Sequence, residues 1–165
     1  MKAAGLSVLA ITVILTANYL GRSISIRIKS LEDFSLLIRS VKTYIWFSKM
    51  PITQIMRKLE NEQNFSRLGF LPSLNEKLDN GMDFYEAWCE SLSEIRINPA
   101  DTELLQAFAE SLGGSDVNGQ LENCDMFLNL IEARLQSLRP KSETRIKVCN
   151  SLGVLLAGLA VIILI

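Results

Sequence analysis

The sequence predicts an all-α protein, a compact bundle of about six helices flanked by an N-terminal and a C-terminal transmembrane helix. Three observations support this prediction. The 165 residues are 48% hydrophobic, and the apolar excess is concentrated at the two ends of the chain. Between the ends, apolar residues recur at helical spacing. No stretch alternates with the period of two that a half-buried strand would show.

The two ends of the chain are candidates for membrane spans. Residues 3–20 and 148–165 are each 18 residues long without a charged side chain. At 1.5 Å per residue each gives about 27 Å of helix, close to the thickness of the hydrocarbon core. The first run follows Lys2 like a signal peptide, but no small-x-small cleavage motif follows it, so an uncleaved anchor is expected. The predicted domains are therefore residues 1–21, 22–147 and 148–165.

Positive charges flank both candidate spans on their inner sides. Seven such residues oppose Lys2 on the outer side: Arg22, Arg27, Lys29, Arg139, Lys141, Arg145 and Lys147. Because Lys and Arg are retained on the cytoplasmic side, residues 22–147 are expected in the cytosol of a two-span membrane protein. Cys89, Cys124 and Cys149 lack pair spacing, which agrees with a reducing compartment.

The first three helices are predicted by apolar spacing and by proline and glycine. Five apolar residues step by 3, 4, 3 and 4 along the first helix: Leu31, Phe34, Ile38, Val41 and Ile45. Pro51 ends or restarts this helix, because proline disfavours the helical conformation of the residue before it. A second helix covers residues 52–59. A third covers residues 71–78, with Pro72 near its start and Asn80-Gly81 as its stop signal.

Capping motifs mark the next two helices. Asp83 resembles the start of a capping box and opens a fourth helix, whose apolar face holds Trp88 as a core residue and extends to Ile95. Asn98-Pro99 supplies the next cap, with proline in the first turn. A glycine pair that begins at Gly113 ends this fifth helix. Its apolar stripe consists of Leu104, Leu105, Phe108 and Leu112.

The sixth helix has the most regular pattern in the chain. Its apolar residues step alternately by 4 and 3: Val117, Leu121, Cys124, Leu128, Ile131, Leu135 and Leu138. Such a repeat suits a long helix packed nearly antiparallel to a partner. The partner is either the first helix of the same chain, which has a matching period, or a second chain in an intermolecular coiled coil through residues 117–138. The second case would describe a self-associating scaffold or regulatory protein. Pro140 predicts a kink or short break before the second span.

The stretch Phe108–Cys124 resembles a phosphate loop, because Gly114 and Gly119 stand five residues apart. A nucleotide loop, however, needs lysine and a hydroxyl after its second glycine, and Gln120 follows here. The stretch is better interpreted as a corner between two helices, with Ser115 or Asp116 as the cap of the second helix.

Catalytic chemistry is not expected. The chain has no histidine, which is the commonest general base and metal ligand, so we expect no enzyme, no cofactor and no metal site. Residues 22–67 hold nine cations and four acids, whereas residues 74–133 hold thirteen acids and two cations. This negative field disfavours nucleic-acid binding. It forms either a solvated surface or a dock for a basic protein partner.

Two stretches, EAWCESL (residues 86–92) and FAESLGGSDVNGQ (residues 108–120), give the chain a resemblance to the stage III sporulation protein AB family of endospore-forming bacteria. Met50-Pro51-Ile52 is similar to a helix-breaking proline at the same place in that family. The resemblance covers essentially the whole chain. Within the second stretch the matching residues are Phe108, Glu110, Leu112, Gly113, Asp116 and Gln120.

The resemblance implies a component of the sporulation channel that links mother cell and forespore. The protein would lie in the mother-cell membrane around the forespore, with its helical domain in the mother-cell cytosol. The family's cytosolic domain is similar to the inner-membrane platform proteins of type II secretion and type IV pili, which engage a secretion ATPase. The implied partners are subunits of the same channel complex, including a secretion-type ATPase like stage III sporulation protein AA, and the lipid bilayer. No nucleic acid or small-molecule substrate is implied.

The resemblance and the predicted corner together identify the candidate residues. Four of them could offer polar groups to a basic loop of a partner: Glu110, Gly113, Asp116 and Gln120. The alternative is that Asp116 only caps its helix. Four further residues are expected to be structural: Trp88, Pro51, Phe108 and Leu112.

Overall fold

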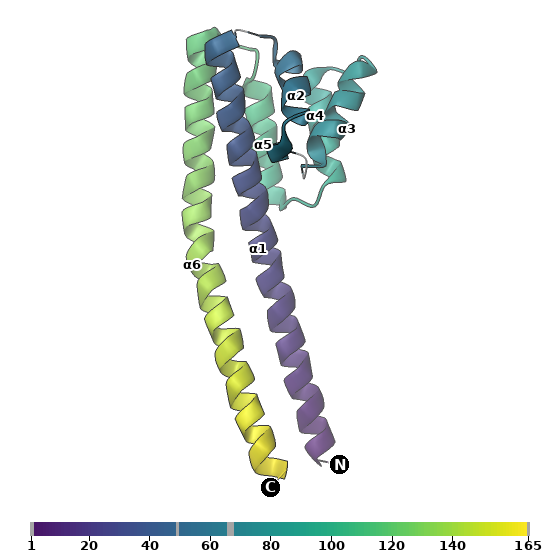
Figure 1. The fold of residues 1–165 in the computed structure, drawn as a ribbon, viewed down its shortest axis with the longest axis vertical. Helices are drawn as coiled ribbons and strands as arrows, with labels where there is room; N and C mark the ends of the chain where they lie inside the picture. The colour runs from purple at the N-terminus through teal and green to yellow at the C-terminus, as the bar shows by residue number, and fades with distance from the viewer. Residues whose placement is uncertain (1, 49, 66–67, 165) are drawn as a thin grey trace. The chain divides into compact units, whose positions relative to one another are not determined.

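The computed structural model of the chain describes residues 2–48, 50–65 and 68–164, which form helices joined by turns and short connections (Figure 1). Side chains are described for residues 23–140 within these ranges. The helices are α1 (Lys2–Ser48), α2 (Ile52–Glu60), the short 3-10 helix η1 (Gln63–Phe65), α3 (Phe70–Asp79), α4 (Phe84–Glu94), α5 (Pro99–Ser111) and α6 (Val117–Leu164). The described residues contain no strand, so the all-α prediction with six helices is confirmed.

The chain divides into two compact units. The central unit comprises residues 29–133, and the terminal unit comprises residues 1–28 together with residues 134–165. The helices α1 and α6 continue through the boundaries predicted near residues 21 and 148. In the part of the chain whose side chains are described, no helix is long and apolar enough to cross a bilayer. The two predicted spans, residues 3–20 and 148–165, lie outside that part.

Local sequence signals set most of the helix ends in the central unit. The Asp83 carboxylate accepts a hydrogen bond from the Tyr85 N–H at 3.0 Å and caps α4. The Asn98 side chain caps α5 in the same way by accepting from the Ala100 N–H at 3.1 Å. Gly81 follows the end of α3 with a φ of 84°, a conformation that glycine adopts without strain. These three ends agree with the predictions.

Proline acts differently at its two predicted positions. Pro51 directly precedes α2, and its carbonyl accepts hydrogen bonds from the N–H groups of Gln54 and Ile55. Of the two alternatives expected at Pro140, a kink or a short break, the break is not found, because α6 continues through this residue. Proline removes one hydrogen bond from a helix, and the other bonds of so long a helix keep it continuous. The expectation that Ile95 lies on α4 is also wrong, since α4 ends at Glu94 and Ile95 is extended.

The core of the central unit is built around a column of five aromatic rings. Each ring comes from a different helix: Phe34, Phe70, Trp88, Phe108 and Phe127. Consecutive ring centroids are 5.4, 4.6, 5.9 and 5.4 Å apart. Such edge-to-face and tilted contacts stabilise a core beyond the area they bury. The column therefore connects α1, α3, α4, α5 and α6 within this unit.

The apolar face of α6 is covered within the chain. Leu121, Cys124 and Ile131 are buried, whereas Leu128 is half-buried and Val117 is exposed. In the central unit Lys42 of α1 forms an ion pair with Asp125 of α6, so the two helices lie side by side there. These contacts favour packing of α6 on the first helix over a coiled coil between chains.

Candidate interaction site

The predicted corner joins α5 to α6 and lies next to the aromatic column. Phe108 contacts both Trp88 and Phe127, and Leu112, the residue after α5, is also buried. The chain then turns at Gly113, which has a φ of 81°. We call residues 110–120 the α5–α6 corner. The buried residues Phe108 and Leu112 hold the corner in position, and its polar residues follow them in the chain.

Two of the four candidate binding residues make hydrogen bonds inside the corner. The Asp116 carboxylate accepts from the Gly119 N–H at 3.0 Å, so Asp116 caps α6. The Gln120 side-chain amide donates to the Ser115 carbonyl at 3.0 Å. Both side chains therefore help to shape the turn, as the capping alternative describes for Asp116.

Gly119 has a structural role that the sequence pattern did not reveal. A Cβ at this position would lie 2.9 Å from the Cβ of Ser115, closer than two such carbons can approach. The absence of a side chain lets the turn close over the first residues of α6. This close approach explains the glycine without a bound phosphate.

Glu110 and Asp116 are the two exposed acids of the corner, and Glu110 makes no hydrogen bond within it. It makes no ion pair with a described residue, and its charge contributes to a raised pKa of Tyr85 on α4, after the larger effect of the hydrogen bond between Tyr85 and Cys89. Glu110 is thus the candidate acid whose carboxylate takes no part in the hydrogen bonds that shape the corner.

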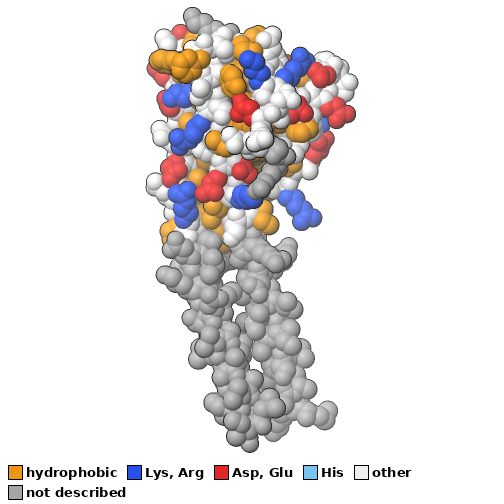
Figure 2. Space-filling view, in the orientation of Figure 1, with side chains coloured by type: hydrophobic (Ala, Val, Ile, Leu, Met, Phe, Trp, Pro, Cys, Tyr) orange, Lys and Arg blue, Asp and Glu red, His pale blue; other side chains and the backbone are white. Residues whose placement is uncertain are grey.

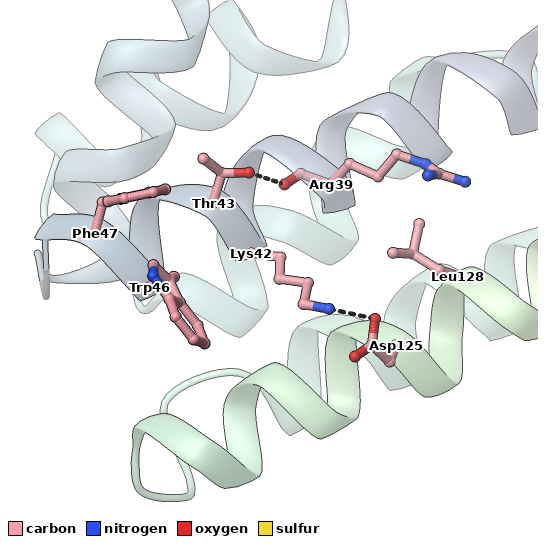
Figure 3. Close-up of a pocket in the computed structure, with 7 residues that line it drawn as sticks. All are labelled: Arg39, Lys42, Thr43, Trp46, Phe47, Asp125 and Leu128. Atoms are coloured by element: carbon pink, nitrogen blue, oxygen red, sulfur yellow. Dashed lines mark hydrogen bonds and ion pairs between the residues drawn. The ribbon is translucent and has the colours of Figure 1, made fainter.

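A second surface, not predicted from the sequence, lies between α1 and α6 (Figure 3). The groove is lined by Arg39, Lys42, Thr43, Trp46 and Phe47 of α1 and by Asp125 and Leu128 of α6. We call it the α1–α6 groove. Trp46 is 63% exposed and Phe47 is 80% exposed at the end of α1. The apolar spacing that predicts the first helix identifies only its buried face. It gives no indication that Trp46 and Phe47 are exposed and line a groove.

The two cysteines with described side chains differ in environment. Burial raises the pKa of the Cys124 thiol to about 11, so it stays protonated and packs as a small apolar group. Cys89 is half-buried on α4. Among the described residues no cluster of three or more potential metal ligands occurs.

Comparison with known protein families matches residues 2–165 to the family described as stage III sporulation protein AB. The chain belongs to this family. The match confirms the resemblance to the stage III sporulation protein AB family that was drawn from residues 86–92 and 108–120. The matched residues include every helix from α1 to α6.

A solved structure titled "Stage III sporulation protein AB (SpoIIIAB)" is similar in fold. It has a TM-score of 0.55 and 21% sequence identity, and the alignment covers 70% of this chain and 94% of that chain. At this identity the likeness shows a shared fold. Comparison with curated proteins finds no match.

Proposed function

We propose that this member of the stage III sporulation protein AB family is a non-catalytic, membrane-anchored platform subunit. It would couple a cytosolic secretion-type ATPase to membrane components of a sporulation channel. The single observation that carries the sporulation role is the family match over residues 2–165. The platform role and the ATPase are the finer part of the proposal.

The anchoring part of the proposal rests on the two uncharged ends of the chain. Residues 3–20 and 148–165 have the length and composition of membrane spans. The helices α1 and α6 each continue from one of these ends into the central unit without an intervening loop. Such a connection suits a protein that links a cytosolic partner to a membrane complex.

The docking part of the proposal rests on the α5–α6 corner. Glu110 is exposed, and the acidic segment 74–133 around it favours a basic partner surface. Asp116 and Gln120 hold the turn in shape, so we expect the direct contact to come chiefly from Glu110. The lack of histidine in the sequence supports a binding role without catalysis.

The experiment is co-purification of the full-length chain in detergent with a candidate secretion ATPase. Glu110→Lys should weaken binding about tenfold, corresponding to about 1.4 kcal/mol, because it reverses a charge at the docking surface. Asp116→Asn should have a smaller effect, since asparagine is an equally good N-cap and only the charge is lost.

Glu76→Lys is the matched control, because Glu76 is an exposed acid on α3 and does not belong to the corner residues 110–120. Equal binding by Glu110→Lys and Glu76→Lys would contradict the corner as the docking site. Failure of the unmodified protein to retain any secretion ATPase would contradict the coupling role itself.

A further inference from the structure

The α1–α6 groove combines the residue types that dominate protein interfaces. Trp46 and Phe47 expose most of their surface, and Arg39 lines the same groove (Figure 3). Tryptophan and arginine are enriched among residues that contribute most of the binding energy. Leu36, exposed by 41%, precedes Thr43 by two helical turns on the same side of α1. Figure 2 shows apolar side chains exposed at the top of the view, where Figure 1 places the end of α1 and the start of α6.

The groove is also basic. Lys42 is paired with Asp125, but the Arg39 guanidinium forms no ion pair with a described carboxylate. The α1–α6 groove of another copy would therefore be a poor partner for this groove, because the contact would bring two Arg39 side chains together. The charge of Arg39 instead favours an acidic surface with an apolar or aromatic component.

The outer face of α4 has this composition. Its side chains lie at positions i, i+1, i+4 and i+5 of one helix: Tyr85, Glu86, Cys89 and Glu90. Glu86 and Glu90 are exposed and lie one turn apart, and no described cation pairs with them to offset their mutual repulsion. Tyr85 is 41% exposed beside them. We call these four residues the α4 outer face.

We propose that copies of this protein assemble head to tail, with the α4 outer face of one copy bound in the α1–α6 groove of the next. Arg39 then pairs with Glu86 or Glu90 across the interface, and Tyr85 packs against Trp46 and Phe47. A single helix lying between two helices is an established mode of recognition.

Because the two surfaces lie on different helices of the central unit, every copy offers both a groove and a complementary face. The contact is heterologous, so further copies can add in the same way. This assembly goes beyond the proposed adaptor function and does not depend on an ATPase. It also differs from a coiled coil through residues 117–138, whose apolar face is largely buried within the chain.

The test uses the native thiol of the α4 outer face. Phe47→Cys and, separately, Thr43→Cys place a second thiol in the groove of the full-length chain, in a Cys149→Ser background. Copper phenanthroline then oxidises neighbouring thiol pairs to disulfides, which form only when the two Cβ atoms approach to about 4 Å. At least one of the two variants should give a ladder of dimers, trimers and larger species on a non-reducing gel, since each copy carries one thiol on each surface.

Two controls define the interface. Adding Cys89→Ser to either variant should abolish the ladder. Gln54→Cys, on an exposed position of α2 outside the groove, should give none. Dimers that persist with Cys89→Ser would show groove-to-groove pairing and overturn the proposal. The absence of cross-links from both groove variants would overturn it as well.

Charge reversal tests the electrostatic part independently. Arg39→Glu should reduce the ladder of the Phe47→Cys or Thr43→Cys variant at least fivefold, and the further change Glu86→Arg with Glu90→Arg should restore it. Circular dichroism of each variant checks that the helices remain. A ladder unchanged by Arg39→Glu would overturn the pairing on which the proposal rests.

Discussion

The two tryptophans of the chain have opposite environments. Trp88 is 0% exposed, and its ring lies 4.6 Å from that of Phe70 and 5.9 Å from that of Phe108. The indole N–H of Trp88 has no hydrogen-bond partner among the described residues. Trp88 therefore stabilises the central unit by packing alone, whereas Trp46 is open to solvent.

We expect Trp88→Ala to lower the free energy of unfolding by about 3–5 kcal/mol, the usual cost of removing a large aromatic side chain from a core. Trp88→Phe should cost much less, because it keeps an aromatic ring and removes an unpaired N–H. The measurement is denaturant unfolding of the full-length protein in detergent, followed by circular dichroism.

Trp46→Ala is the control of the same residue type, and it should change the free energy of unfolding by no more than about 0.5 kcal/mol. Similar losses for Trp46→Ala and Trp88→Ala would contradict the aromatic column as the centre of the core.

Residue environments were predictable only where helical spacing reveals them. Trp88 was assigned to the core because Phe84 and Ala87 lie beside it on an apolar face. Trp46 has no such signal, since spacing shows which residues share a face but not which faces are left uncovered by the fold. The same limit applies to Asp116 and Gln120, because their hydrogen bonds depend on the path of the turn.

At the scale of elements, the α5–α6 corner depends on adjacent glycines with different roles. Gly113 has a φ of 81°, in the left-handed region, whereas Gly114 does not adopt a positive φ. A Cβ at either position would meet nothing within 4 Å. Alanine substitutions at Gly113 and Gly114 therefore test the effect of backbone conformation alone, because an added Cβ would contact no other atom at either position.

Gly113→Ala should destabilise the protein by about 1–2 kcal/mol, because an L-residue with a side chain pays that cost in the left-handed conformation. Gly114→Ala should be neutral or stabilising by up to about 1 kcal/mol, since alanine restricts the unfolded chain. Thermal and denaturant unfolding of the two variants in parallel measures the difference. If Gly114→Ala proved the more damaging change, the turn would have to follow another path.

Helix ends with a local cause were predictable from the sequence. Asp83 and Asn98 cap α4 and α5 with their own side chains, and Gly81 permits the turn after α3. At Pro140 the sequence does not decide between a kink and a break, because the effect of one proline competes with the hydrogen bonds of a 48-residue helix, and α6 stays continuous there. Local signals therefore locate short helices better than they divide long ones.

At the scale of the whole molecule, ion pairs connect the basic and the acidic segments. Lys42 pairs with Asp125 and Arg57 with Asp79, so cations from residues 22–67 hold carboxylates from residues 74–133. Both pairs are partly or largely exposed and contribute little stability. The charge separation seen in sequence is thus only partly neutralised on folding, and Glu86, Glu90 and Glu110 pair with no described cation.

The membrane topology is tested by the accessibility of Cys89. The seven Lys and Arg residues that flank the apolar ends predict that residues 22–147 face the cytosol. In a Cys149→Ser background expressed in bacteria, a membrane-impermeant maleimide should leave Cys89 unmodified in intact cells and modify it after permeabilisation. Cys124 is buried and should stay unmodified in both cases until the protein is denatured.

A second cysteine position controls for the partial burial of Cys89 and for its coverage by a neighbouring copy. Gln54→Cys is exposed on α2 and should follow Cys89, because both residues belong to the central unit. Removal of both apolar ends should release the remaining chain from the membrane fraction, whereas removal of residues 1–21 alone should not, since residues 148–165 would still anchor it. Modification of Cys89 in intact cells would place the central unit outside the cytosol, where no cytosolic ATPase could reach it.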